Sequence, residues 1–139
     1  AVGSRRRSER ECQLGERGGD CWEYGKMTQA YDEAPFEIDH VIAKKHDGLT
    51  TSANLSLSCF WCNSFKGSNI AGRDRKTRKL TPLFNPRRHS WTRHFRWQGA
   101  YLIGRTPIGR VTIAILRINH PLRVELRQNL IDEGVFPFL

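Results

Sequence analysis

Two cysteines three residues apart, Cys59 and Cys62 in the stretch CFWCNSFKG, constrain this chain more than any other feature. A Cys-x-x-Cys pair usually offers two thiolates to one metal ion, and zinc takes four ligands. The chain has two further cysteines, Cys12 and Cys21, that could complete such a site. The alternative is that the thiols are buried and pack as small apolar side chains.

Length and composition favour a single globular domain. The chain has 139 residues, of which 38% are hydrophobic, and a domain of this size buries about two thirds of its unfolded surface. No run approaches the ~20 apolar residues that span a bilayer, and the basic N-terminus leads into no apolar segment. We expect a disordered basic tail over residues 1–11, one domain over residues 12–139, and a reducing, cytoplasmic location that favours metal binding over disulfides.

The charge of the chain predicts a polyanionic partner. The formal net charge is +9 and the pI is about 10.0, a balance typical of nucleic-acid-binding domains. Between Lys66 and Arg96 many basic residues are opposed only by Asp74. A solvated basic face is the alternative, and there the interleaved aromatic residues, which are Trp91, Phe95 and Trp97, would pack on the core.

The middle of the chain predicts a strand–strand–helix unit. Residues 36–42 are rich in β-branched and aromatic side chains, which favours a strand. Residues 44–52 form a polar loop, and residues 54–59 alternate apolar and polar side chains as a second strand would. Residues 62–67 then predict a short helix that ends at Gly67.

The rest of the chain predicts a loop-rich segment over residues 68–91, then a strand pair that turns at Gly99. Thr106 and Pro107 are typical of a helix start, so a helix is expected over residues 108–119, with a strand as the alternative because many residues there are β-branched. A second amphipathic helix over residues 122–133 would end at Gly134. Its expected apolar stripe is Leu122, Leu126 and Leu130.

The predicted unit collects residues that suit phosphodiester hydrolysis. Asp39 and His40 end the first strand, Asn54 begins the second, and Asn63 lies at the helix. Aspartate and asparagine offer the oxygen ligands that Mg²⁺ and Mn²⁺ prefer. A histidine titrates near neutral pH and can accept a proton from water. Together with a basic surface, these residues predict a metal-dependent phosphodiesterase.

Three segments in this order, EIDHV, NLSLSC and CFWCNSFKG, resemble the HNH endonucleases. The similarity continues through LTPLFNPRRHSWTRHFRW and TPIGRVTIAILRIN and so covers roughly residues 21–137. The resemblance implies an α+β fold with a ββα-metal core and C-terminal helices. It also implies a metal-dependent DNA endonuclease.

The resemblance implies a role for each residue of the predicted site. His40 would be the general base, and Asp39 and Asn63 would hold the catalytic Mg²⁺ or Mn²⁺. Asn54 would fix the loop and orient His40 through a backbone contact. Lys66 would lie near the phosphate, and Glu37, which faces the same side of the strand as Asp39, would be an outer ligand.

The family also implies a structural Zn²⁺ between two Cys-x-x-Cys pairs, and here the chain departs from the pattern. Cys21 is in place, but Tyr24 stands where the second cysteine of the first pair belongs. A phenol is a poor zinc ligand because it ionises with difficulty. Either Cys12 completes a site of four cysteines, or the site lacks a ligand.

DNA is the expected partner, with RNA as an alternative; no membrane contact is expected, and the sequence carries no signal for a particular oligomeric state. Arginine and lysine side chains commonly position nucleic acid through its phosphates. The candidates for this role are Lys44, Lys45, Lys66, Arg87, Arg88, Arg93 and Arg96. The alternative function is a zinc-ribbon module that binds nucleic acid without catalysis and does not need His40.

Overall fold

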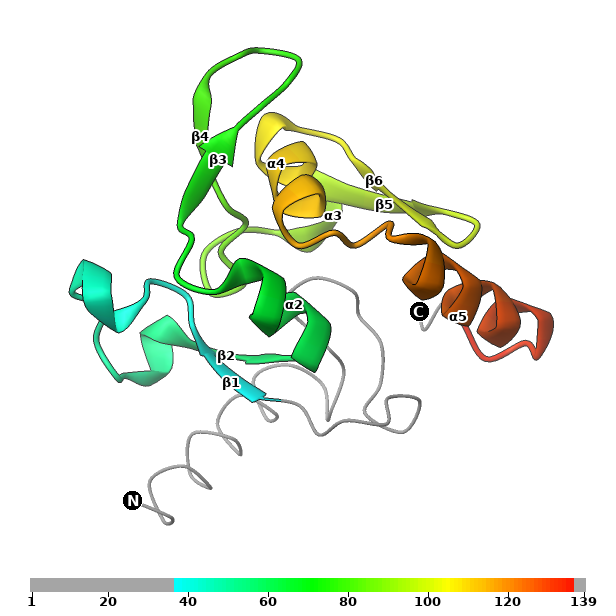
Figure 1. The fold of residues 1–139 in the computed structure, drawn as a ribbon, viewed down its shortest axis with the longest axis horizontal. Helices are drawn as coiled ribbons and strands as arrows, with labels where there is room; N and C mark the ends of the chain where they lie inside the picture. Colours follow the sequence, from blue (N-terminus) through cyan, green and yellow to red (C-terminus); the bar gives the residue numbers. More distant parts are fainter. Residues whose placement is uncertain (1–36, 137–139) are drawn as a thin grey trace.

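The computed structural model describes residues 37–136 of the chain (Figure 1). This part combines helices with small antiparallel two-stranded sheets, which confirms the predicted α+β class. No helix among the described residues is long and apolar enough to cross a lipid bilayer. The expected basic tail over residues 1–11, the cysteines Cys12 and Cys21, and Tyr24 lie outside the described residues.

The first unit is the predicted strand–strand–helix. Strand β1 (Glu37–His40) pairs antiparallel with β2 (Leu55–Ser58), and helix α2 (Phe60–Lys66) follows β2 directly. The loop between the strands holds two 3-10 turns, η2 (Lys44–His46) and η3 (Ser52–Asn54). β1 ends at His40, two residues before the expected end at Ile42, since the side chain of Asn54 rather than a facing strand binds the backbone of Ile42.

Helix α2 begins at Phe60, two residues before the predicted start at Cys62. The reason is a cap: Cys59 has an extended backbone, and its sulfur accepts a hydrogen bond from the backbone N–H of Cys62 at 3.5 Å. Such a side-chain acceptor satisfies one of the unpaired donors in the first turn. Gly67 ends the helix as predicted, with a φ of 50° that favours glycine.

Residues 68–91 were expected to be loop-rich, and this prediction is wrong in part. They contain a hairpin of β3 (Ala71–Arg73) and β4 (Leu80–Pro82) and the start of the short helix α3 (Trp91–His94). The strands are three residues long and carry no clear alternation of apolar and polar side chains. What stabilises them is tertiary contact: a Cβ on Gly72 would lie 3.0 Å from Val111 of α4.

The C-terminal half follows the predictions more closely. Strands β5 (Phe95–Gln98) and β6 (Tyr101–Gly104) form the expected hairpin, with Gly99 at a φ of 57° in the turn. Helix α4 (Pro107–Ile115) is capped by Thr106, whose hydroxyl accepts from the N–H of Gly109 at 3.1 Å. The strand alternative for this segment is wrong, although the helix ends four residues before Asn119.

Helix α5 (Pro121–Asp132) is confirmed, but its expected apolar stripe is wrong. Leu130 is buried, whereas Leu122 is 63% exposed and Leu126 is 41% exposed. The buried side of α5 consists instead of Arg127 and Leu130. The guanidinium of Arg127 is buried because it finds hydrogen-bond acceptors in the interior, whereas the pattern predicted Leu122 and Leu126 to be buried there.

The core joins β2, α2, the β5–β6 hairpin and α4. Trp91 and Trp97 pack against it, and Phe95 is only 1% exposed. Arg93 and Arg96 are exposed. The aromatic residues of the basic stretch therefore pack on the core, while the neighbouring Arg93 and Arg96 face water. The buried members of the core are Leu55, Leu57, Cys59, Cys62, Leu83, Phe84, Phe95, Leu102, Val111, Leu116 and Ile118.

Arg127 joins α5 to this core. Its side chain is 1% exposed and donates to the carbonyl oxygens of Ala100 at 2.7 Å and Ile118 at 2.8 Å. The guanidinium also lies 5.2 Å from the centre of the Trp97 ring. Burial lowers the pKa of Arg127 to about 10, which still leaves it charged at neutral pH.

We expect the substitution Arg127→Ala to lower the free energy of unfolding by about 3 kcal/mol, because it leaves two buried carbonyl groups without donors and opens a void. Urea unfolding of the full chain measures this change. Arg96→Ala, at an exposed position, is the matched control and should change stability by less than about 0.5 kcal/mol. Equal stability of the two variants would contradict the structural role of Arg127.

Candidate active site and cysteine pair

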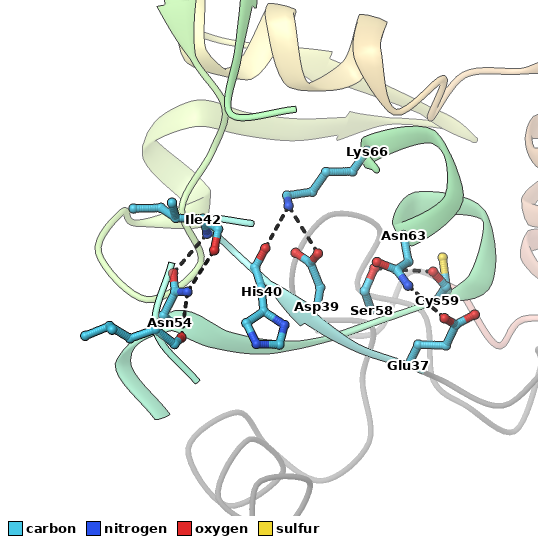
Figure 2. A network of polar contacts seen from close by, with 10 residues as sticks. Glu37, Asp39, His40, Ile42, Asn54, Ser58, Cys59, Asn63 and Lys66 are labelled. Atoms are coloured by element: carbon cyan, nitrogen blue, oxygen red, sulfur yellow. Dashed lines mark hydrogen bonds and ion pairs between the residues drawn. The ribbon is translucent and has the colours of Figure 1, made fainter. Parts of the chain in front are cut away.

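The end of β1, the middle of α2 and the residues that follow α2 meet at an open pocket of about 220 Å³. Its lining includes Asp39, His40, Lys44 and Asn63. Three of the four predicted catalytic residues therefore line one pocket. Figure 2 shows these residues on β1 and α2. The fourth, Asn54, is the last residue before β2 and does not line this pocket.

Asp39 is held by Lys66. Lys66 reaches back from the last turn of α2, and its Nζ donates to Asp39 Oδ1 at 3.1 Å and to the backbone oxygen of His40 at 3.0 Å. The two side chains are 1% and 4% exposed. Lys66 was expected beside a phosphate, but the structure buries its ammonium against Asp39, because a buried carboxylate requires a counter-charge.

Asn63 is oriented by Glu37. The amide nitrogen of Asn63 donates to Glu37 Oε2 at 2.7 Å. An ionised carboxylate only accepts hydrogen bonds, so the amide nitrogen must face it, and the amide oxygen points away from Glu37. Glu37 thus controls the direction in which the oxygen of Asn63 points. The sequence analysis expected Glu37 as an outer ligand of the metal and did not predict this direct contact with Asn63.

His40 is positioned by a residue that the sequence analysis did not identify. Its Nε2 lies 3.0 Å from the hydroxyl oxygen of Thr50 in the loop before β2. Partial burial, followed by the nearby charges of Lys44 and Lys66, lowers the pKa of His40 below its usual value. The imidazole is therefore predominantly neutral at pH 7, which is the form that accepts a proton. A lone threonine in a polar loop carries no sequence signal for this contact.

Asn54 closes the loop that follows β1. Its side-chain oxygen accepts from the N–H of Ile42, and its amide nitrogen donates to the carbonyl oxygens of Ile42 and Leu49, each at 2.9 Å. These contacts agree with the predicted loop-fixing role. The backbone contact falls on Ile42, two residues after His40, so Asn54 orients His40 only through the chain between them.

The two sulfurs of the cysteine pair converge on one arginine. Cys62 is fully buried and Cys59 is 6% exposed. Nη2 of Arg123, on α5, lies 3.0 Å from Cys62 Sγ and 3.8 Å from Cys59 Sγ. Hydrogen bonds from a cation favour the thiolate form that binds metals. Arg123 was not identified from the sequence, because α5 is more than fifty positions away.

The described residues contain no group of three or more His, Cys, Asp or Glu side chains that could hold a metal ion. The cysteine pair contributes two sulfurs, and the other predicted zinc ligands, Cys12 and Cys21, lie outside residues 37–136. The active-site pocket is lined by one carboxylate residue, Asp39, together with the amide residue Asn63.

The predicted nucleic-acid contacts divide into two groups. Arg87 is half-buried, and its Nε donates to the carbonyl oxygen of Leu55 at 2.8 Å, so it braces the start of β2. Lys66 is buried. The remaining candidates are exposed and are Lys44, Lys45, Arg88, Arg93 and Arg96.

The model of the HNH endonuclease family matches residues 19–69 of the chain. This range contains β1, β2 and α2, with the pocket residues and the cysteine pair, so the resemblance to HNH endonucleases is confirmed over it. No curated protein and no solved structure matches the chain significantly. An HNH domain indicates a nuclease or another function on nucleic acid. The similarity expected from residue 70 to residue 137 stays a prediction.

We expect Lys44→Met to raise the pKa of His40, because the positive charge of Lys44 disfavours a second positive charge on the imidazole. Lys45→Met is the matched control, since Lys45 is not among the groups that shift His40. NMR titration of the histidine ring protons in metal-free protein measures both, with the His40 signal assigned by its loss in His40→Ala. An unchanged or lower pKa in Lys44→Met would contradict this electrostatic coupling.

Proposed function

We propose that the chain is a metal-dependent DNA endonuclease that hydrolyses phosphodiester bonds with His40 as the general base. The observation that carries the proposal is a neutral, half-buried histidine in the same pocket as Asp39 and Asn63. A general base must be unprotonated at working pH and within reach of the water that it activates. The lowered pKa of His40 supports the first requirement, and the pocket open to solvent beside it supports the second.

His40 would take the proton of the attacking water at Nδ1. Its Nε2 is engaged by Thr50, and donation from Nε2–H to the threonine oxygen leaves Nδ1 unprotonated. The same contact restrains the ring. Lys44 lines the pocket and is exposed, so it could contact the phosphate of a substrate bound in front of His40.

Asp39 and Asn63 would hold a divalent cation, Mg²⁺ or Mn²⁺. Their donor set fits, because a carboxylate and an amide oxygen are the hard ligands these ions prefer. When bound, the cation neutralises charge that develops on the leaving oxygen. Lys66 holds the Asp39 carboxylate in place, and Glu37 directs the oxygen of Asn63 away from itself.

A structural Zn²⁺ would be held by Cys59 and Cys62 together with Cys21 and Cys12. The pair fits zinc because both sulfurs lie on one turn and accept from the same guanidinium. The Arg123 charge would offset the negative charge of the thiolates. This arrangement would brace α2, which carries Asn63 and Lys66, and would join the segment before β1 to the rest of a single domain over residues 12–139.

We expect His40→Ala to reduce nicking of supercoiled plasmid by roughly 10²–10⁴-fold in the presence of Mg²⁺ or Mn²⁺, the usual contribution of a general base. His46→Ala, in the same loop but exposed and outside the pocket, is the matched control and should cut normally. Addition of EDTA should stop cleavage by every variant. If the unmodified protein shifts the plasmid on a gel but cuts with neither metal, the zinc-ribbon binding module is the better account.

We expect the purified chain to contain zinc and Cys62→Ser to lose it, with lower thermal stability. Competition with a chromophoric chelator measures the affinity. Cys12→Ser distinguishes the two forms of the site: it should release zinc if Cys12 is the fourth ligand. If Tyr24→Cys instead tightens binding and Cys12→Ser has no effect, the site lacks a ligand in the natural chain. Equal zinc content in Cys62→Ser and the unmodified protein would rule out this site.

A further inference from the structure

The hairpin of β3 and β4 carries a dense positive charge that the proposed active site does not use. We call residues 73–79 the basic tip. All five of its cationic residues are exposed. In Figure 1 this hairpin projects away from β1, β2 and α2. The cationic residues of the basic tip are Arg73, Arg75, Lys76, Arg78 and Lys79.

The one acidic residue of the basic tip does not oppose these charges. Asp74 is 1% exposed and accepts two hydrogen bonds from the Arg110 guanidinium, at 3.0 Å to each carboxylate oxygen. This contact holds the pKa of Asp74 well below its usual range, so the carboxylate is charged and paired with Arg110. Asp74 therefore anchors the hairpin to α4 and leaves the surface of the basic tip uniformly positive.

The basic tip is preformed rather than a loose loop. The N–H of Asp74 donates to the carbonyl of Lys79 at 3.0 Å, and the N–H of Arg78 donates to the carbonyl of Asp74 at 2.7 Å. Asp74 Oδ2 also accepts from the N–H of Thr77 at 3.0 Å. These bonds fix the backbone that carries the exposed cations, which reduces the entropy cost when a ligand binds.

Stability alone does not account for this composition. Like charges on a short hairpin repel one another and disfavour the folded state. Arg78 adds to the cost because its φ is 63°, a left-handed conformation that costs a residue with a Cβ about 1 kcal/mol and that glycine or asparagine adopts more easily. A partner with closely spaced negative charges would relieve the repulsion.

We propose that the basic tip is a phosphate-binding arm. It would contact backbone phosphates of duplex DNA at a distance from the phosphate that is cleaved. The partner follows from the chemistry: guanidinium and ammonium groups without aromatic or amide neighbours in residues 73–79 suit phosphates rather than bases. This inference rests on the proposed function for the choice of DNA. The basic tip would extend the DNA-contacting surface beyond the pocket. It would raise the affinity for DNA without adding a preference for any base sequence.

Two double variants, each of which removes two positive charges, test the proposal. Arg75→Gln with Lys76→Gln removes two charges from the basic tip. Arg105→Gln with Arg117→Gln removes two exposed charges that already have intramolecular partners: Arg105 bonds the Thr92 carbonyl and Arg117 lies over the Phe65 ring. Binding of a fluorescent DNA duplex is measured by anisotropy at several salt concentrations, without added Mg²⁺ or Mn²⁺ and in the His40→Ala background, so that the duplex is not cut and bound zinc is kept.

We expect the double variant of the basic tip to bind more weakly and to reduce the slope of log K against log salt by about 1.8, at roughly 0.9 for each phosphate that is no longer neutralised. The control double variant should keep the slope. If both lower the affinity equally with the same slope, only the net charge matters and the basic tip is a solvated surface, which overturns the inference.

Asp74→Asn distinguishes a preformed arm from simple attraction between net charges, because the two predict opposite changes in the affinity for DNA. The substitution raises the net positive charge, so simple attraction predicts tighter binding. Loss of the anchor to Arg110 predicts weaker binding, which is the result expected here. Circular dichroism of the variant checks that the rest of the chain remains folded; if it does not, the double variants decide the question alone.

Plasmid cleavage, measured in parallel, keeps this inference distinct from the proposed function. Normal cleavage by the unmodified protein with no effect of the basic tip on binding overturns the arm alone. Binding through the basic tip without cleavage under any metal overturns the endonuclease and keeps the arm. Absence of duplex binding by the unmodified protein overturns the arm.

Discussion

The buried ion pair between Lys66 and Asp39 is the contact on which the geometry of the site depends. One ammonium group binds a carboxylate of β1 and the carbonyl of the next residue, so the last turn of α2 is tied to the end of β1. Burial of such a pair gains little net stability, but loss of one partner leaves a charge stranded in the interior. The pair therefore acts mainly to define one arrangement of the strand and the helix.

The same cation also affects the chemistry of its neighbour. Lys66 and Lys44 both lower the pKa of His40, in addition to the larger effect of burial. The contact that positions Asp39 thus also favours the neutral form of the histidine. Glu37 and Asn63 form a second link between β1 and α2, so the strand and the helix are joined at two points.

Helix α5 connects the ββα unit to the C-terminal half through two arginines one turn apart. Arg123 reaches the cysteine pair at the start of α2, and Arg127 reaches the turn of the β5–β6 hairpin. Residues four apart lie on the same side of a helix. The apolar pattern of α5 was misleading because these long side chains bury their stems and find acceptors inside, which leaves Leu122 and Leu126 exposed.

The sequence by itself determined the strand–strand–helix order, the Thr106 and Gly67 helix boundaries, and the grouping of Asp39, His40 and Asn63, because alternation, capping and turn residues act over a few positions. The tertiary structure alone decided the contacts made across long separations. Lys66 is buried because it pairs with the buried Asp39, and Thr50 contacts His40 because the loop folds back. The β3–β4 hairpin is stabilised because α4 packs on Gly72. Such pairings depend on burial and distance, which local sequence patterns do not encode.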